Sequence, residues 1–455
     1  MKHYIVLLLC LAAGSSAFGA TEKPNILFIV ADDMGYGDCG VQGCKDVPTP
    51  SIDAIANGGV RFTNGYVSGS VCSPSRAALM TGRYQQRDGV MDWVRHGASH
   101  ALNPDVPTVA DYLKHAGYHT MLVGKWHLGE PDECHPLNRG FDEFYGFLGG
   151  GRTYWINGSE QNVNPYAQIV RQREPIDETE YTTFAFGREA VSFIERRKGQ
   201  DKPFFLYLAF NAVHKPMEAP QDYIDRFSAI QDGKRRTYAG MLTAMDEMIG
   251  KVLAALRDTG AEQNTLICFI SDNGGPITHN APNASTNTPL RGGKGETWEG
   301  GIRVPFLMKW PGHIKPGSVD DTIVIQMDFV ATALALVGKK PDPRWPIDGV
   351  DLMPHLTDNV PLPDRMLYWY CPTNAPQWAI RDGKWKLTYA IAPRGKLAPT
   401  IGLYDLSQDI HEDHDLSASD PARVARMRAA WEKWRAAIGF KVKAKVQHSD
   451  INAAP

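Results

Sequence analysis

The segment Pro24-Asn25-Ile26-Leu27-Phe28-Ile29-Val30-Ala31-Asp32-Asp33 joins an unbroken apolar run to two adjacent carboxylates. An apolar run without alternation is typical of a strand buried on both faces, so we predict a strand at residues 25–30. Strands of this kind belong to parallel sheets, in which helices cover both sides. The segment therefore predicts an α/β fold, with Asp32 and Asp33 placed where the strand ends.

Three further apolar runs repeat this pattern, at residues 120–123, 204–210 and 266–270. Helical patterns lie between them. The clearest spans residues 238–256, where apolar residues recur at helical spacing until Gly260 ends the pattern. Alternating strands and helices predict a mainly parallel sheet that is sandwiched by helices.

The last part of the sequence has a different pattern. Short apolar stretches separated by Gly and Asp turns predict a small antiparallel sheet. Its strands are expected at residues 366–370, 378–381, 385–389 and 403–406. A final helix is predicted after Asp420, a good N-cap. The Pro-rich stretch near Pro361 is the expected boundary between a catalytic domain at residues 21–362 and a C-terminal α+β subdomain at residues 363–455.

Residues 1–20 are typical of a signal peptide. Lys2 supplies the positive start, residues 4–13 form the apolar core, and small residues continue to Ala20. The apolar core is too short for a membrane span of about 20 residues. We therefore expect cleavage, export to the periplasm or the extracellular space, and no stable membrane insertion.

Charge and cysteine content narrow the class of protein. The formal net charge is -3, so no nucleic-acid partner is expected. Cys39 and Cys44 are close enough in sequence to form a disulfide, although spacing alone leaves this open. The sequence has no CxxC pair, so it gives no support to a thiolate zinc site.

Polar side chains follow each predicted parallel strand directly. They are Asp32 and Asp33, Lys125 and His127, Asn211 and His214, and Asp272 and Asn273. Open α/β sheets bind ligands beyond the carboxyl ends of their strands. These four loops are therefore expected to converge on one site.

The first and last of these strand ends offer only oxygen ligands. Hard cations such as Ca²⁺ and Mg²⁺ prefer the oxygen atoms of residues such as Asp32, Asp33, Asp272 and Asn273, whereas zinc sites favour His and Cys. Adjacent carboxylates are also costly to bury unless a cation neutralises them. Taken alone, each pair favours an ordinary turn, since Asp-Asp and Asp-Asn-Gly-Gly are common in loops.

Around Cys72 the sequence reads Val71-Cys72-Ser73-Pro74-Ser75-Arg76-Ala77-Ala78-Leu79-Met80-Thr81-Gly82-Arg83. Pro74 and Ser75 suit the start of a helix, which we expect to run toward Thr81. A helix N-terminus stabilises an oxygen-rich nucleophile, and Arg76 adds donors for an oxyanion. A lone Cys before a helix is otherwise typical of buried packing.

Cys-x-Pro-Ser-Arg at residues 72–76, followed by Ala-Ala-Leu-Met-Thr-Gly-Arg, resembles the signature of the formylglycine-dependent (type I) sulfatases. Further motifs agree with that family in order and type. They are residues 24–33, Gly124-Lys125-Trp126-His127-Leu128-Gly129, and Leu290-Arg291-Gly292-Gly293-Lys294-Gly295-Glu296-Thr297-Trp298-Glu299-Gly300-Gly301-Ile302-Arg303-Val304-Pro305. The resemblance covers essentially the whole chain after the signal peptide. It implies an alkaline-phosphatase-like fold with a smaller C-terminal antiparallel sheet plus helix.

The resemblance also implies a cofactor and a modified residue. Asp32, Asp33, Asp272 and Asn273 would hold Ca²⁺, and residue 72 would complete the metal shell through an oxygen. A formylglycine-generating maturation enzyme would oxidise Cys72 to an aldehyde, formylglycine (3-oxoalanine). The hydrated aldehyde, a gem-diol, would attack sulfur with one hydroxyl and expel sulfate by means of the other.

Roles for the basic residues follow from the same resemblance. Arg76, Lys125 and Lys294 would offset the charge of the sulfate. His127 would be the base for the gem-diol step. His214, with Lys294, would donate a proton to the leaving oxygen.

Several loop residues are candidates for contact with the substrate. The predicted substrate-binding residues are Arg152, His279, His96 and Arg95, with Trp93 and Trp155 as possible stacking partners for a sugar. The glycines at residues 149–151 either shape a loop around a ligand or form a flexible turn. The resemblance to bacterial secreted glycan sulfatases implies a sulfated glycan as the substrate, in preference to a steroid or a small aryl sulfate.

Two other functions remain open at the level of sequence. Phosphonate monoester and phosphodiester hydrolases share this superfamily architecture, and some use the same modified cysteine. A non-catalytic glycan-binding relative would keep the pocket but lack the nucleophile, which is disfavoured because Cys72 is present. The alkaline-phosphatase type is also disfavoured, since it uses two zinc ions and a Ser or Thr nucleophile.

Overall fold

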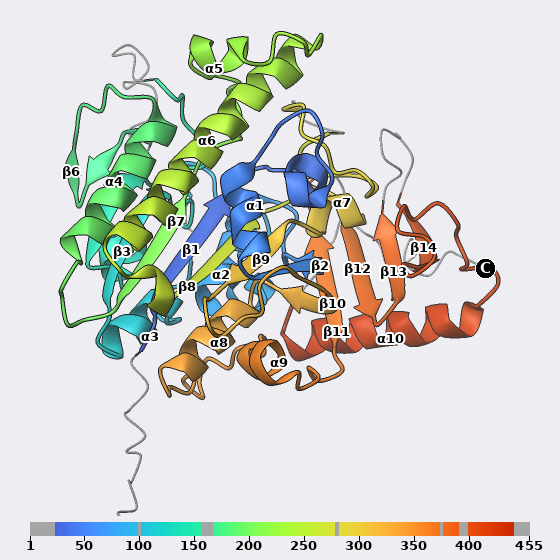
Figure 1. Ribbon diagram of the computed structural model, residues 1–455. Helices are drawn as coiled ribbons and strands as arrows, with labels where there is room; N and C mark the ends of the chain where they lie inside the picture. The colour runs from blue at the N-terminus through green and yellow to red at the C-terminus, as the bar shows by residue number, and fades with distance from the viewer. Residues whose placement is uncertain are drawn as a thin grey trace, which may run out of the picture.

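A ten-stranded sheet and a four-stranded sheet organise the computed structural model (Figure 1). It describes residues 23–98, 102–155, 167–277, 282–373, 376–390 and 399–440. The predicted signal peptide at residues 1–20 lies outside these ranges. The strands of the large sheet are ordered β10-β2-β9-β8-β1-β7-β3-β4-β5-β6.

The centre of the large sheet consists of the four strands that the apolar runs predicted. They are β8 (Thr265–Ser271), β1 (Asn25–Ala31), β7 (Phe204–Ala209) and β3 (His119–Lys125). These neighbours pair in parallel, so Phe28 lies beside Tyr207 on one side and Cys268 on the other. Their carboxyl ends therefore share one edge of the sheet, as the sequence predicted.

The outer strands make the sheet mixed. On one side lie β9 (Phe306–Lys309), β2 (Val60–Tyr66) and β10 (Ser318–Ile325), and on the other β4 (Glu143–Phe147), β5 (Val170–Arg171) and β6 (Glu174–Pro175). Of these, β9 is antiparallel to both of its neighbours, whereas β10 pairs in parallel with β2, and β4 with β3.

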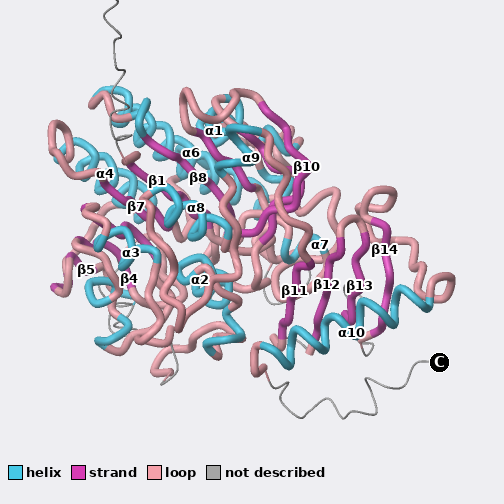
Figure 2. Tube along the Cα trace, turned by 90° about the horizontal axis from the view of Figure 1, so that it is seen from below, coloured by secondary structure: helices cyan, strands magenta, loops and turns pink. Residues whose placement is uncertain are grey.

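Helices cover both faces of the large sheet. Alternate residues of the central strands therefore pack into two separate hydrophobic cores. Leu27 and Ile29 pack into one core, and Ile26 and Phe28 into the other. The first core includes α1 (Pro50–Asn57), α4 (Thr182–Arg196) and α6 (Gly233–Asp258). The second includes α2 (Cys72–Thr81), α3 (Val109–His115) and α8 (Asp328–Leu336). Figure 2 shows the sheet between α4 and α6 on one side and α2 and α3 on the other.

Two helices begin earlier than predicted. Helix α2 begins at Cys72 itself and not at Pro74 or Ser75, so the cysteine lies within the first turn. Helix α6 begins at Gly233, where the Asp232 carboxylate accepts hydrogen bonds from the backbone N–H groups of Lys234 and Arg235. The polar first turn of α6 carries no apolar periodicity, which is why the prediction began only at residue 238.

The small sheet is antiparallel, as predicted, and the fold class is confirmed. Its strands are β11 (Met366–Cys371), β12 (Gln377–Asp382), β13 (Trp385–Ala390) and β14 (Thr400–Asp405). Helix α10 (Pro421–Ala437) begins after the predicted N-cap Asp420 and buries Met427 and Trp431 against this sheet. On its other face, Leu367 and Trp369 pack against the large domain. The boundary near Pro361 remains a prediction.

Short helices and loops complete the fold. The short helices are α5 (Gln221–Asp225), α7 (Glu299–Ile302) and α9 (Met353–Asp358). Within the described residues, no helix has the length and apolar character needed to cross a membrane. Cys39 and Cys44 are both free thiols, so the disulfide that their spacing left open is not formed in this structure.

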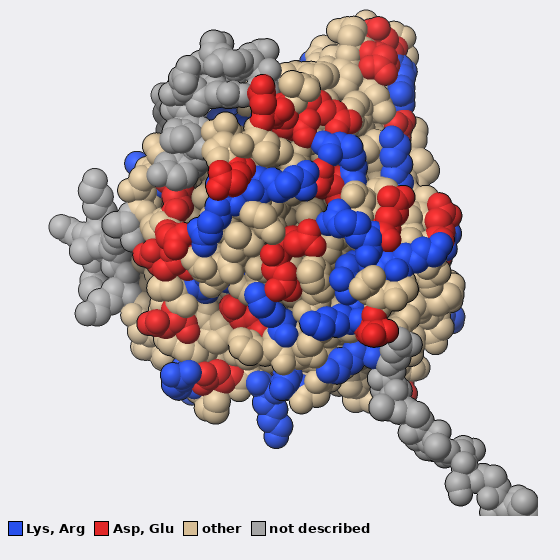
Figure 3. Space-filling view, turned by 90° about the vertical axis from the view of Figure 1, so that its left-hand side faces the viewer, with Lys and Arg blue, Asp and Glu red and all other residues tan. Residues whose placement is uncertain are grey.

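The surface shown in Figure 3 carries Lys and Arg interspersed with Asp and Glu. Arg196 pairs with Glu143, and Arg188 pairs with Glu178. Because opposite charges alternate, this face presents no field of one sign.

Candidate active site

The polar residues at the strand ends meet, as the sequence predicted, beside the first turn of α2. Asp32 and Asp33 follow β1, and Asp272 follows β8. One ligand atom from each of these carboxylates and the Cys72 sulfur lie within 4.8 Å of one another. All four side chains are buried. The parallel register of β1 and β8 is what brings residues so distant in sequence together.

A basic side chain neutralises each of the three carboxylates. The Lys125 Nζ atom lies 2.7 Å from Asp32, and the Lys294 Nζ atom lies 2.6 Å from Asp33. The Arg76 Nε atom donates to Asp272 at 2.9 Å. Burial lowers the pKa of Arg76, but nearby Asp272 outweighs it, so the guanidinium stays charged. Carboxylates and cations thus form one buried, alternating cluster.

This cluster suits a hard cation. Burial, followed by repulsion from Asp32, raises the pKa of Asp272 to about 6, and a cation among the carboxylates would relieve that repulsion. The buried Oδ1 atom of Asn273 has no hydrogen-bond partner within the described ranges, although its Nδ2 atom donates to Asp33 at 2.7 Å. An unpaired amide oxygen beside three carboxylates matches the oxygen ligands that Ca²⁺ prefers.

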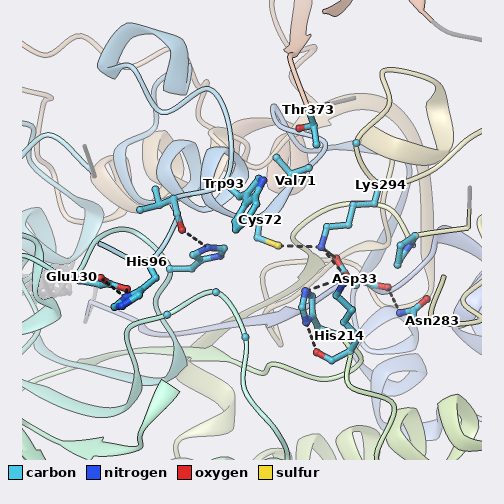
Figure 4. Close-up of a pocket in the computed structure, with 18 residues that line it drawn as sticks. Asp33, Val71, Cys72, Trp93, His96, Glu130, His214, Asn283, Lys294 and Thr373 are labelled. Carbon is cyan, nitrogen blue, oxygen red and sulfur yellow. Dashed lines mark hydrogen bonds and ion pairs between the residues drawn. The ribbon is translucent and has the colours of Figure 1, made fainter. Parts of the chain in front are cut away.

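Cys72 occupies the first turn of α2, at the edge of this cluster (Figure 4). Its sulfur lies 3.4 Å from the Lys294 Nζ atom and 3.6 Å from Asp32 Oδ1. Burial raises the pKa of the Cys72 thiol to about 12, even though Lys125 and Lys294 oppose the shift. The unmodified side chain is therefore a neutral thiol at neutral pH and a poor nucleophile.

His127 is held in one orientation by the backbone. Its Nε2 atom lies 3.1 Å from the Val94 carbonyl oxygen and donates to it, which leaves Nδ1 as the unprotonated nitrogen. Buried Nδ1 has no hydrogen-bond partner in the described part of the chain. Burial, together with the charge of Lys125, lowers the pKa of His127 well below its usual value. The ring is therefore neutral and has a free lone pair.

His214 lies on the opposite side of the cluster, close to Asp33 (Figure 4). Its Nδ1 atom is 2.6 Å from the Lys215 carbonyl oxygen, and its Nε2 atom is 3.7 Å from Asp33. Burial lowers the pKa of His214 to about 3, although Asp33 acts in the other direction. Added negative charge near Nε2 would raise this pKa.

The glycine loop at residues 149–151 packs closely against the rings of His127 and His214. A Cβ atom on Gly150 would lie 2.4 Å from the Nε2 atom of His127. A Cβ atom on Gly151 would lie 3.3 Å from the Cε1 atom of His214. At Gly150 the backbone approaches the ring too closely for any side chain, so this loop is a fitted wall of the site.

A cavity of about 630 Å³ opens onto these residues. Its described lining includes Asp33, Cys72, His127, His214 and Lys294. The volume is within the range of small-molecule sites, roughly 300–1,000 Å³. The site therefore has room for more than a sulfate group.

The predicted substrate-binding residues are placed differently from one another. His96 lines the cavity, and Arg95 lies over the Trp93 ring, 5.0 Å from its centroid. Arg152 is buried, donates to the Thr153 carbonyl oxygen, and is not among the residues that line the cavity. His279 lies outside the described residues.

Other residues of the site were not predicted from the sequence. Glu130 and Thr373 line the cavity, and Asn283 donates hydrogen bonds to the carbonyl oxygens of Asp33 and Val213. Ser73 accepts a hydrogen bond from the Val94 backbone. Of these, only Glu130 had a usable sequence signal, because it directly follows the Gly124–Gly129 motif.

A mainly parallel sheet covered by helices, with basic side chains around a buried carboxylate cluster, places the protein among the alkaline-phosphatase-like hydrolases. The family model described as sulfatase matches residues 24–339, and the chain belongs to this family: it is a sulfuric ester hydrolase. A second model, described as the C-terminal part of N-sulphoglucosamine sulphohydrolase, matches residues 294–433. The family predicted from the motifs is thereby confirmed.

Curated relatives include mammalian sulfatases. Human N-acetylgalactosamine-6-sulfatase is 37% identical over 375 residues, which is 78% of this chain and 70% of the relative. Human arylsulfatase A is 34% identical over 451 residues, which is 90% of this chain and 86% of the relative.

Solved structures with the same fold include the following proteins. Ps i-CgsB, in complex with k-i-k-neocarrahexaose, has a TM-score of 0.85 and 37% identity, covering 90% of this chain and 92% of that one. PsFucS1 sulfatase from Pseudoalteromonas sp. has a TM-score of 0.79 and 28% identity, covering 91% of this chain and 90% of that one. The phosphonate monoester hydrolase of Agrobacterium radiobacter, at 22% identity, shares the fold.

Proposed function

We propose that this sulfatase hydrolyses sulfate esters of a sulfated carbohydrate, with residue 72 converted from cysteine to formylglycine and with Ca²⁺ in the carboxylate cluster. The observation that carries the proposal is the position of Cys72. Its sulfur lies within the cluster of Asp32, Asp33 and Asp272, at the floor of a cavity large enough for a sugar. Burial raises the pKa of the Cys72 thiol, and a neutral thiol is a poor nucleophile, which supports conversion of this residue to another group.

The residues fit both groups. When bound, Ca²⁺ would polarise the sulfate ester, and the oxidised, hydrated side chain of residue 72 would supply the attacking hydroxyl. Asp32, Asp33, Asp272 and Asn273 would hold the ion, and Asn273 already has a buried Oδ1 atom without a partner among the described residues. These are the ligands that the family resemblance implied.

Three cations would bind the sulfate oxygens. Arg76, Lys125 and Lys294 pair with the carboxylates in this structure, and with the carboxylates bound to Ca²⁺ part of their positive charge would face the substrate. Fixed cations in a water-poor site stabilise negative charge that develops in the transition state more strongly than they would in water. Lys294 is the best placed, since its Nζ atom already contacts the Cys72 sulfur at 3.4 Å.

His127 would accept the proton of the nucleophile. Its Nδ1 atom has a free lone pair, because Nε2 donates to the Val94 carbonyl oxygen. A neutral imidazole is the form that a base requires. His214 would protonate the leaving oxygen, once the charge of the bound sulfate has raised its pKa from about 3.

A carbohydrate substrate is supported by the relatives and by the cavity. N-acetylgalactosamine-6-sulfatase is named for a sugar substrate, and the Ps i-CgsB structure contains an oligosaccharide. The cavity extends past the sulfate pocket to Trp93, an aromatic side chain suited to stacking on a sugar. The sequence of residues 1–20 further supports export, where such glycans are encountered.

The experiment measures both the modification of residue 72 and the release of sulfate. Protein produced together with a formylglycine-generating enzyme is digested. Mass spectrometry of the peptide that contains Cys72 then shows whether it has the mass loss of thiol-to-aldehyde conversion. The same preparation is then assayed for sulfate release from a panel of defined sulfated oligosaccharides. Cys268→Ser is the matched control, since this buried cysteine lies in β8 away from the site. Matured protein that releases no sulfate from any glycan would contradict the proposal.

The same preparation separates the remaining alternatives. A higher rate on an aryl phosphonate than on an aryl sulfate would favour the phosphonate monoester hydrolase function. Elemental analysis that finds zinc and no calcium would overturn the proposed cofactor, because Asp32, Cys72 and His214 also form a group that could hold a metal.

A further inference from the structure

The cavity has an outer wall that takes no part in the chemistry described above. Trp93, His96 and Glu130 form this wall. In Figure 4, His96 and Glu130 lie on the far side of Cys72 from Lys294. A substrate whose sulfate occupies the floor would extend its sugar toward this wall.

Glu130 presents a carboxylate to the cavity. Its side chain is only 9% exposed and accepts a hydrogen bond from the Gly97 backbone at 2.9 Å. The His96 Nδ1 atom lies 3.2 Å away, and Glu130 makes no ion pair with Lys or Arg within the described ranges. An ionised carboxylate has about four lone-pair sites, so acceptor capacity remains for a ligand.

Trp93 presents a ring to the same space. It is 45% exposed although it borders the cavity, which is unusual for so large an apolar side chain. Its loop is fixed on both sides of the ring: Asp92 accepts hydrogen bonds from Trp93 N and Thr373 Oγ1, and Val94 N donates to Ser73. A preorganised aromatic side chain binds with little loss of conformational entropy.

We propose that Trp93 and Glu130 form a subsite for an uncharged sugar ring next to the sulfate ester, and that Glu130 excludes a second anionic group there. The ring of Trp93 packs against the apolar face of the sugar, and Glu130 accepts hydrogen bonds from its hydroxyls. A sulfate or carboxylate in place of those hydroxyls faces the Glu130 carboxylate at close range, which is unfavourable; Arg95 lies over the Trp93 ring and makes no ion pair with Glu130 within the described ranges. The inference rests on the proposed function and specifies its substrate class: a glycan with isolated sulfate groups.

The test uses two oligosaccharides that differ by one sulfate, placed on the ring next to the ester that is cleaved. The kcat/KM of matured enzyme is measured on each and divided by that variant's value on a small aryl sulfate. We expect the wild type to prefer the singly sulfated compound by about tenfold or more, the effect of one close like-charge contact. Glu130→Gln should bring the preference close to unity, and Trp93→Ala should lower the normalised value on both glycans by about tenfold.

Controls separate specificity from folding. Glu174→Gln removes an exposed carboxylate in β6 and should keep the wild-type preference. Trp93→Phe should restore most of the loss caused by Trp93→Ala, since an aromatic face remains. An unchanged preference in Glu130→Gln would overturn the subsite alone. Cleavage of the aryl sulfate with neither glycan turned over would instead contradict the carbohydrate proposal itself, and the subsite with it.

Discussion

The Gln377 Nε2 atom donates a hydrogen bond to the Gly295 carbonyl oxygen at 3.2 Å, so a strand of the C-terminal sheet holds the backbone beside Lys294. The N–H group of the same residue, Gly295, donates to the Ser70 carbonyl oxygen at 2.8 Å, close to Cys72 in sequence. Gln377 is fully buried. The small sheet is therefore part of the framework that positions the Lys294 side chain.

Gln377→Leu should lower kcat by about tenfold with little change in KM, because loss of one buried hydrogen bond lets Lys294 shift away from residue 72, the proposed nucleophile. Steady-state kinetics on an aryl sulfate provide the measurement. Gln408→Leu, at an exposed position that follows β14, is the matched control. A change in KM alone would argue against a positioning role.

A buried ion cluster joins the two sheets. Lys386 in β13 contacts Glu299 at 2.9 Å and Glu412 at 2.8 Å, and all three side chains are fully buried. Lys386→Met leaves the buried Glu412 without this cation, whereas Glu299 keeps Arg303 at 3.3 Å, and should lower the free energy of unfolding by about 3–5 kcal/mol. Urea denaturation tests this, with the half-exposed Lys384→Met as control. Equal stability of the two variants would contradict the prediction.

The close approach of Gly150 to His127 makes a further prediction. Gly150→Ala places a methyl group 2.4 Å from the ring nitrogen that donates to Val94, so the imidazole must move. A displacement of about 1 Å at a catalytic group costs on the order of a hundredfold in rate. We expect such a loss in kcat with an unchanged melting temperature. Gly233→Ala, where a Cβ meets no atom within 4 Å, should have no effect.

Asp246 lies away from the active site, and its raised pKa predicts that the stability of the protein depends on pH. Its carboxylate accepts backbone hydrogen bonds from Ser51 and Ile52 at the start of α1, and burial raises its pKa from 3.8 to about 6. Between these values the folded protein binds a proton that the unfolded chain does not, so stability falls as the pH rises from about 4 to about 6. Asp246→Asn should reduce this fall by about 2–3 kcal/mol.

Urea denaturation across this pH range gives the measurement for Asp246. Asp222→Asn, at an exposed carboxylate, is expected to keep the wild-type pH profile. A wild-type profile in Asp246→Asn would show that other groups account for the dependence.

Calcium binding can be measured independently of activity. If the cluster of Asp32, Asp33 and Asp272 binds the ion, chelation should lower the melting temperature and added Ca²⁺ should restore it. At a ligand concentration of about 100 times Kd, the expected stabilisation is about 2.7 kcal/mol. Asp272→Asn should abolish most of the response, whereas Asp358→Asn, at an exposed position, should retain it. A response to zinc alone would reassign the metal.

The centre of the fold could be predicted because its strands are buried on both faces. Their residues, such as those of β1, are apolar without interruption, and the polar side chains that follow them necessarily share an edge. The strand β2 escaped prediction because Arg61, Thr63 and Asn64 interrupt its apolar pattern. The start of α2 was missed because Val71, its N-cap, makes no side-chain cap that a sequence could reveal.

The wall of the cavity depends on contacts that no local pattern encodes. The Val94 backbone bridges Ser73 and His127, and Glu130 holds Gly97. These contacts join segments that are separated in the chain and use backbone atoms, which every residue possesses. Arg152 shows that charge alone does not locate a side chain. Its charge suggested a contact with a ligand, but the side chain is buried and donates to the Thr153 carbonyl oxygen.

The burial of Cys72 has a consequence for the order of events during synthesis. In the folded chain its side chain is almost inaccessible, so the maturation enzyme of the proposed function would have to reach it before the chain has folded. Gln377, which helps to close the loop over this position, is translated roughly 300 residues later; at about 5–20 residues per second, this leaves tens of seconds. If residue 72 is converted as proposed, the late synthesis of the C-terminal sheet would leave the cysteine accessible to oxidation while the chain is still emerging.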